Sequence, residues 1–119
     1  MIERWTSIPG YEEFYEISNK GQIRSLDPRD PGKIMKLELD RDEKYYVVRL
    51  TRFGIRKKLA VHRLVYTSFE EDLLPGEIVH HIDENKLNNW LNNLLKVNSV
   101  EHRRMHNKNL KPIFISIIN

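Results

Sequence analysis

Histidine is concentrated in one short segment of the chain, residues 79–106. Four of the five histidines lie there: the pair His80 and His81, then His102 and His106. The last two are four residues apart, so on a helix both imidazoles lie on the same face. Imidazole is the commonest metal-binding side chain in proteins. The arrangement indicates a divalent metal held by histidines, with one histidine left over as a base, and therefore a hydrolytic enzyme.

Length and composition limit the classes of protein to consider. The chain has 119 residues and no cysteine, which favours one domain and excludes disulfides and thiolate zinc sites. It contains neither a signal peptide nor a transmembrane span, because the apolar run Ile113–Ile118 is too short to cross a bilayer. We therefore expect a cytoplasmic protein without a membrane partner.

Charge is distributed in blocks along the chain. Residues 31–63 carry a net charge of +6 and residues 96–119 a net +4, and between them residues 64–95 carry a net −5. Two basic blocks around an acidic one suit a polyanion that is bound on either side of a metal site. The alternative is that these lysines and arginines only solvate the surface.

The first half of the chain reads as short strands and turns. Alternation predicts a strand over residues 22–26, and β-branched and aromatic residues predict another over 45–51. Phe53-Gly54 then turns the chain into a return strand over 57–61. Basic residues at the tip of this hairpin either contact phosphates or are simply solvated; they are Arg52, Arg56, Lys57 and Lys58.

The second half predicts a helix, a strand pair and another helix. Apolar residues at helical spacing predict the first helix over 61–69. The histidine pair lies on a short strand over 78–81, and residues 94–97 form the returning strand. Ser99 is an N-cap for a helix over 100–108, with Pro112 beyond its end.

Several motifs in this order resemble one known family. The strand–loop–strand–helix pattern resembles the ββα-metal (His-Me finger) motif of HNH endonucleases of the phage and intron homing type. Upstream motifs resemble the NUMOD4-like module that precedes it in those proteins. The segments that carry the resemblance, which extends over about residues 5–106, are Ile8–Glu12, Tyr15–Asn19, Gly21–Leu26, Val61–Val65, Val79–Asp83, Asn85–Asn89 and Asn93-Leu94.

The resemblance implies an α+β fold in which an N-terminal small antiparallel β module precedes a ββα-metal nuclease core. The expected module occupies residues 1–60 and the nuclease core residues 61–110. Residues 111–119 form a tail that resembles the start of a C-terminal DNA-binding region.

The resemblance also implies roles for individual residues. His81 matches the general base, and Asn93 matches the central asparagine that orients the base or braces the loop. His80, His102 and His106 match metal positions. The implied cofactor is one divalent metal ion, Mg or Mn, although three imidazoles favour Ni, Co or Zn more than an all-oxygen site does.

The implied function is metal-dependent cleavage of double-stranded DNA to 5′-phosphate and 3′-hydroxyl ends. A monomer would nick one strand, and a homodimer could cut both. Arg103 and Arg104 are either phosphate contacts or solvated charges. The family further implies a phage or mobile-element source.

Two alternatives come from other functional classes. An inactive relative would keep the fold and act as a DNA-binding or regulatory protein. A structural zinc module would use His80, His102 and His106 only to hold the fold, and chelation would then unfold it.

Four further residues are open to two interpretations each. His62, at the start of a helix, is read as structural rather than as a ligand, and Asp83 as a turn former rather than as the acceptor for a ligand imidazole. Trp90 either packs on the core or touches DNA, and His106 is either a ligand or a solvent-facing helix residue.

Overall fold

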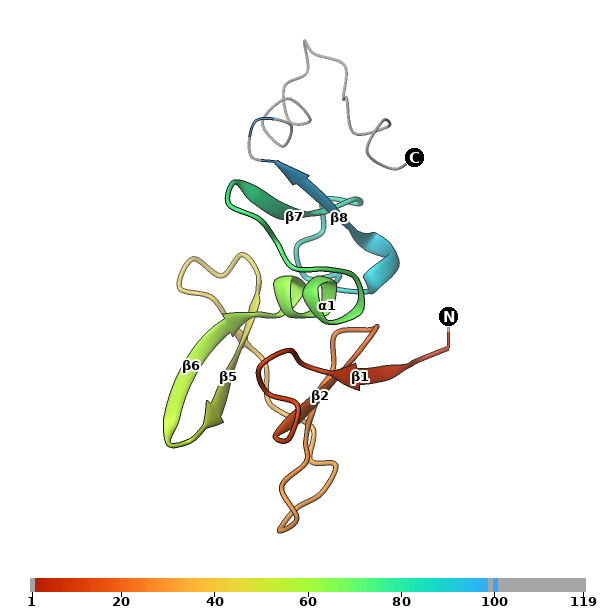
Figure 1. Cartoon of the computed structure of the whole chain (residues 1–119). Coiled ribbons are helices and arrows are strands. Elements are labelled where there is room, and N and C mark those ends of the chain that lie inside the picture. Colours follow the sequence, from red (N-terminus) through yellow and green to blue (C-terminus); the bar gives the residue numbers. More distant parts are fainter. Residues whose placement is uncertain (1, 99, 101–119) are drawn as a thin grey trace.

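The computed structural model describes residues 2–98 and residue 100, so all but the first residue of the helix predicted over 100–108, and the whole tail, lie outside the described residues. The described part consists of three small antiparallel sheets around one α-helix (Figure 1). This arrangement confirms the predicted α+β class. No helix in it is long and apolar enough to span a membrane.

Two three-stranded sheets form the N-terminal half. The first has the order β1-β2-β3, with strands Trp5–Ser7, Tyr15–Ser18 and Ile23–Ser25. The second has the order β4-β5-β6, with strands Glu38–Leu39, Tyr46–Arg52 and Ile55–Ala60. The predicted turn joins β5 to β6: Phe53 and Gly54 have φ angles of 48° and 76°, as a two-residue type I′ turn requires.

The second half begins without a linker, because helix α1 (Val61–Phe69) directly follows β6. Strand β7 (Glu77–His81) pairs with β8 (Leu94–Asn98), and the short 3-10 helix η1 (Leu91–Asn93) leads into β8. The predicted helix over 61–69 and both predicted strands are confirmed, each strand one residue longer than expected.

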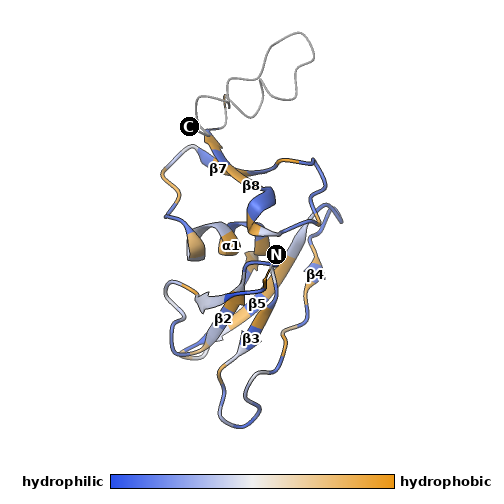
Figure 2. Ribbon diagram, turned by 90° about the vertical axis from the view of Figure 1, so that its right-hand side faces the viewer, coloured by the Kyte–Doolittle hydropathy of each residue, from blue (hydrophilic) through white to orange (hydrophobic). Residues whose placement is uncertain are grey.

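Helix α1 lies at the centre of the molecule and contacts elements of all three sheets. Its two fully buried residues, Val61 and Val65, pack in a core with Ile17, Val48 and Leu50. Figure 2 shows hydrophobic residues along the strands beneath α1 and mostly hydrophilic residues in the long connections. Burial of this one apolar face is what holds the sheets together.

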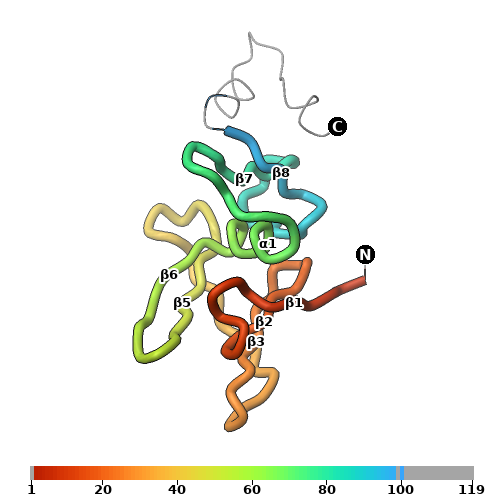
Figure 3. Tube along the Cα trace, viewed as in Figure 1, coloured from red at the N-terminus to blue at the C-terminus, as the bar shows by residue number. Residues whose placement is uncertain are grey.

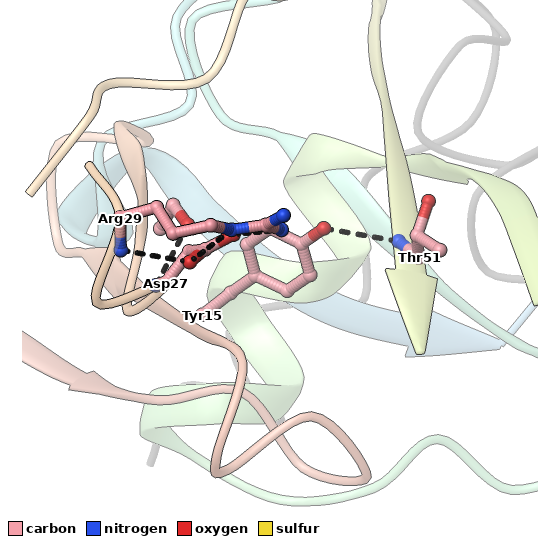
Figure 4. A network of polar contacts seen from close by, with 5 residues as sticks. Tyr15, Asp27, Arg29 and Thr51 are labelled. Carbon is pink, nitrogen blue, oxygen red and sulfur yellow. Dashed lines mark hydrogen bonds and ion pairs between the residues drawn. The ribbon is translucent and has the colours of Figure 1, made fainter. Parts of the chain in front are cut away.

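A hydrogen bond also joins the two N-terminal sheets. The Thr51 N–H of β5 donates to the Tyr15 hydroxyl of β2 at 3.1 Å, as Figure 4 shows. In the same view, Arg29 donates to the Asp27 carboxylate at 2.7 Å. That hydrogen bond is the main reason why the pKa of Asp27 falls to about 2. The N-terminal sheets thus meet through a specific polar contact as well as through the core.

Candidate functional site

The β7–β8 pair carries the two histidines on adjacent positions of one strand. His80 lies opposite Leu95 and His81 opposite Leu94 in the register. Both imidazoles are buried, with 7% and 6% of their surface exposed. Adjacent residues on a strand project to opposite faces, so the strand gives the two side chains different surroundings, as two different roles require.

His81 is held by a buried amide. Its Nε2 lies 2.8 Å from Oδ1 of Asn89, and Asn89 is only 4% exposed. An amide oxygen accepts hydrogen bonds and does not donate them, so Nε2 of a neutral His81 must carry the hydrogen. Nδ1 then keeps its lone pair, which is the state that a general base needs.

The ring of His81 also packs against that of His62. The ring centroids are 5.1 Å apart, and the Tyr45 ring lies edge-on to His62 at 5.3 Å. Burial is the main cause that lowers the pKa of His62 to about 4, and the charges of His81 and Arg63 contribute to this shift. His62 therefore stays neutral near pH 7. Sequence reasoning read it as structural, and the structure places it against the predicted base.

A cavity of about 330 Å³ opens beside these rings. It is large enough to admit a phosphate group together with water molecules, since a water occupies about 30 Å³ of liquid. The residues that line it carry imidazole, carboxylate and ammonium groups and include Tyr45, His62, His80, His81, Glu84 and Lys86.

Asn93 braces the loop between β7 and β8. Its Oδ1 accepts from the Asp83 N–H at 3.0 Å, and its Nδ2 donates to Asp83 Oδ1 and to the Asn88 carbonyl, each at 2.9 Å. The resemblance left two roles open for Asn93, to orient the base or to brace the loop. These contacts are those of a residue that braces the loop.

Asp83 behaves as the predicted turn former. Its carboxylate accepts from the Asn88 side chain at 2.9 Å and from the Asn85 N–H at 2.8 Å. These hydrogen bonds, the one from Asn88 foremost, lower the pKa of Asp83 below its usual range. The carboxylate therefore stays ionised at neutral pH and keeps the loop in one conformation.

Of the predicted metal ligands, only His80 lies in the described part of the chain. His102 and His106, as well as Arg103 and Arg104, lie outside the described residues. Within residues 2–98 and 100, no group of three ligating side chains comes together. The three-histidine site thus stays a prediction in which His80, beside the cavity, supplies one imidazole.

The hairpin residues predicted to bind DNA fall into three environments. Arg52 donates to the Gly10 carbonyl, and its guanidinium lies 4.8 Å from the centroid of the Tyr11 ring. Arg56 and Lys58 are exposed on β6 opposite Thr51 and Arg49. Lys57 lies opposite Leu50, which is fully buried, so Lys57 belongs to the other face of the hairpin.

Sequence reasoning missed one residue of the site, Asn89. It singled out Asn93, which follows the resemblance, and treated residues 87–92 as a polar connection. One signal for Asn89 was present in the sequence: the Asn88-Asn89 pair lies in the short connection that brings the chain back to pair with β7. Trp90, left undecided, lies beside Lys20, whose Nζ is 5.2 Å from the ring centroid.

Two family models match the chain in succession. The NUMOD4 motif matches residues 3–51, and the HNH endonuclease model matches residues 59–104. The chain belongs to the HNH endonuclease family. The second match contains β7, β8 and the loop braced by Asn93.

Relatives of this chain come from a phage and a giant virus. It is 39% identical to the DNA endonuclease I-HmuI of Bacillus phage SP01 over 90 residues, which are 76% of this chain and 49% of the relative. It is 35% identical to an uncharacterised HNH endonuclease of Acanthamoeba polyphaga mimivirus over 116 residues, 96% of this chain and 33% of that protein. The chain thus spans half or less of the length of these two relatives.

A solved structure resembles this chain over nearly the whole length of the chain. That structure describes DNA binding and cleavage by the HNH homing endonuclease I-HmuI. The TM-score is 0.75 at 33% identity, over 97% of this chain and 65% of the other. The predicted family and fold class are both confirmed.

Proposed function

We propose that this HNH endonuclease hydrolyses phosphodiester bonds of double-stranded DNA with the aid of a divalent metal ion, and that it nicks one strand at a time. The observation that carries the proposal is the buried hydrogen bond from His81 Nε2 to Asn89 Oδ1, which leaves Nδ1 as a base beside a cavity. The similarity of the chain to the DNA endonuclease I-HmuI supports the choice of substrate.

In this mechanism the protein's own residues position and deprotonate the nucleophile. Nδ1 of His81 takes a proton from a water molecule as that water attacks phosphorus. Asn93 keeps the loop next to His81 in place through its hydrogen bonds to Asp83 and Asn88. The neutral His62 ring packs on His81 without adding a positive charge that would oppose proton transfer.

Imidazole donors fit a divalent ion of borderline softness. His80 would hold it together with His102, and His106 is a third candidate ligand. When bound, the ion would polarise the phosphate and stabilise the leaving 3′-oxygen. Cleavage on that side of phosphorus leaves 5′-phosphate and 3′-hydroxyl ends.

We assign contact with the DNA backbone to basic side chains. Arg56 and Lys58 lie on the outer face of the β5–β6 hairpin, and we assign phosphate contacts to them together with Arg103 and Arg104. A sequence pI near 9.2 is consistent with a polyanionic partner. One base serves one scissile phosphate at a time, so a monomer nicks, whereas a homodimer would cut both strands.

A plasmid assay tests this proposal. Supercoiled plasmid is incubated with the full chain and with Mg, Mn, Ni, Co or Zn ions added separately. We expect conversion to open circles with at least one ion and none in the presence of chelator. DNA ligase should then reseal the circles, because it requires 5′-phosphate and 3′-hydroxyl ends.

Other outcomes of this assay would overturn parts of the proposal. Absence of cleavage with every ion would contradict the nuclease activity. Linear product at early times would contradict nicking, and open circles that ligase does not seal would contradict the assigned ends.

A further inference from the structure

We propose that the turn formed by residues 19–21 of the N-terminal module is a functional part of the nuclease centre, because it positions Asn89, which in turn sets the orientation and tautomer of His81. This inference rests on the proposed role of His81 as the base. It makes Asn89 a positioning residue that acts through His81.

The first link is the contact between Asn89 and His81. The 2.8 Å hydrogen bond joins two side chains that are 4% and 6% exposed. Little water can reach this pair, so loss of the amide oxygen would leave the Nε2–H without a ready substitute. The imidazole would then be free to rotate or to move its hydrogen to Nδ1, where it would block the base.

The second link is a run of three consecutive contacts between the turn and the loop that carries Asn89. A Cβ atom placed on Gly21 would lie 3.1 Å from Asn89 Cβ and 3.5 Å from its carbonyl oxygen. Lys20 lies over the Trp90 ring at 5.2 Å, and the Leu91 N–H donates to the Asn19 carbonyl at 2.8 Å. In Figure 3, the orange turn after β2 lies beside the cyan segment before β8.

The third link anchors the turn itself. Asn19 is 1% exposed, and its side chain accepts from the Arg4 N–H at 2.8 Å and donates to the Ile2 carbonyl at 3.1 Å. Its own N–H donates to the Arg4 carbonyl at 2.9 Å. The turn is therefore fixed to the first strand region, and it presents a rigid surface to Asn89.

The close approach at Gly21 explains why this position suits only glycine. Its φ of +88° is strained for other residues, and any side chain would press on Asn89. Gly32 offers a matched comparison, because its φ is +79° and an added Cβ would meet nothing within 4 Å. Both substitutions by alanine incur the backbone strain, and only the one at Gly21 displaces Asn89.

Substitutions at Asn89 test the first link. Asn89→Leu removes the acceptor with little change of size, and we expect the cleavage rate at saturating DNA to fall about 100-fold with DNA binding unchanged. Asn89→Asp keeps an acceptor oxygen and should recover most of that loss. Asn92→Leu, at an exposed position of the adjacent helix η1, is the control and should cleave like the wild type.

Gly21→Ala and Gly32→Ala test the second link. We expect Gly21→Ala to slow cleavage at saturating DNA by about 10- to 100-fold, and Gly32→Ala to leave the rate unchanged. Far-UV circular dichroism and thermal melting confirm that each variant is folded. Equal rates for the two folded variants would overturn the coupling between the turn and the centre.

A nuclear magnetic resonance measurement keeps the test independent of cleavage. Long-range nitrogen–proton spectra of histidine-labelled protein, assigned with His81→Ala, show which ring nitrogen of neutral His81 carries the hydrogen. We expect Nε2 in the wild type and in Asn89→Asp, and a mixture in Asn89→Leu and Gly21→Ala.

The two measurements separate this inference from the nuclease proposal. A wild type without cleavage but with His81 in the Nε2–H form would contradict only the activity. A hydrogen on Nδ1 of the wild type, or full activity of folded Asn89→Leu, would overturn the positioning role of Asn89.

Discussion

The surroundings of His81 and the β5–β6 hairpin differ in almost every physical property. His81 is buried, hydrogen-bonded to Asn89 and packed on His62. Arg56 and Lys58 are exposed on β6, an edge strand of the sheet β4-β5-β6. Proton transfer requires fixed geometry and exclusion of competing water, whereas attraction between cations and phosphates acts over a longer range and tolerates motion. Mutations should therefore be able to change the cleavage rate and the DNA affinity separately.

Among these predictions, removal of the Asn93 side chain, which braces the loop next to His81, has the largest expected effect. Asn93→Ala deletes three hydrogen bonds to Asp83 and Asn88. We expect cleavage to fall about 100-fold and the free energy of unfolding to fall by about 1–3 kcal/mol. Rates on short duplexes at saturating DNA and denaturant titrations measure these two effects.

The matched control for Asn93→Ala is Asn92→Ala, an exposed neighbour. Asn93→Asp should also fail, because its carboxylate would face that of Asp83 in place of a donor. Stability and cleavage of Asn93→Ala equal to those of the wild type would show that the loop needs no brace.

Removal of the outer-face cations tests the exposed side. We expect Arg56→Ala combined with Lys58→Ala to weaken DNA binding and to reduce the slope of log K against log salt by about 2, which corresponds to two lost phosphate contacts. The cleavage rate of bound DNA should stay unchanged. Filter binding or fluorescence anisotropy across a salt series gives the slope.

Lys57→Ala is the control on the opposite face of the same strand, where Lys57 lies opposite Leu50. Its salt slope should fall by less than that of the double variant. If the salt slope falls by the same amount per removed charge on both faces of β6, DNA does not bind preferentially to the face that carries Arg56 and Lys58.

The smallest expected effect concerns pH and the neutral ring beside His81. Burial depresses the pKa of His62 from 6.5 to about 4, so the unfolded chain binds a proton more readily than the folded protein between these values. The stability contribution of His62 is thus fully present above pH 6.5 and is lost progressively as pH falls to about 4. Chemical denaturation at pH 4 to 7.5 measures it.

His62→Phe keeps an aromatic ring and removes the titrating group. The variant should lose less stability than the wild type over that pH range, since other groups titrate equally in both. Parallel pH profiles for the two proteins would mean that His62 is protonated as easily in the folded state as in the unfolded state.

Local sequence patterns predicted the helix, strands and turns, but they could not predict the contacts between segments that lie far apart in the sequence. Helix α1, the turn at Phe53-Gly54 and the strand that carries His80 and His81 follow from periodicity and turn chemistry, which are local properties. The hydrogen bond of Arg52 to Gly10 joins residues 42 apart in sequence, so no local pattern could predict it.

The candidate site shows the same division. The motif around His81 and Asn93 was recognisable because its spacing is kept within one short segment. The roles of Asn89 and His62 depend on how the loop and the start of α1 fold against β7, and polar loop residues carry no periodic signal of such packing. The histidines beyond residue 100 stay a prediction.

The most direct test of the account is the single-turnover cleavage of supercoiled plasmid by the wild type and by His81→Ala, with the metal ion that best supports cleavage. We predict a loss of at least about 100-fold in His81→Ala, with DNA binding close to that of the wild type and with the variant still folded at the assay temperature. Cleavage by the folded variant at the wild-type rate would contradict the claim that His81 is the base.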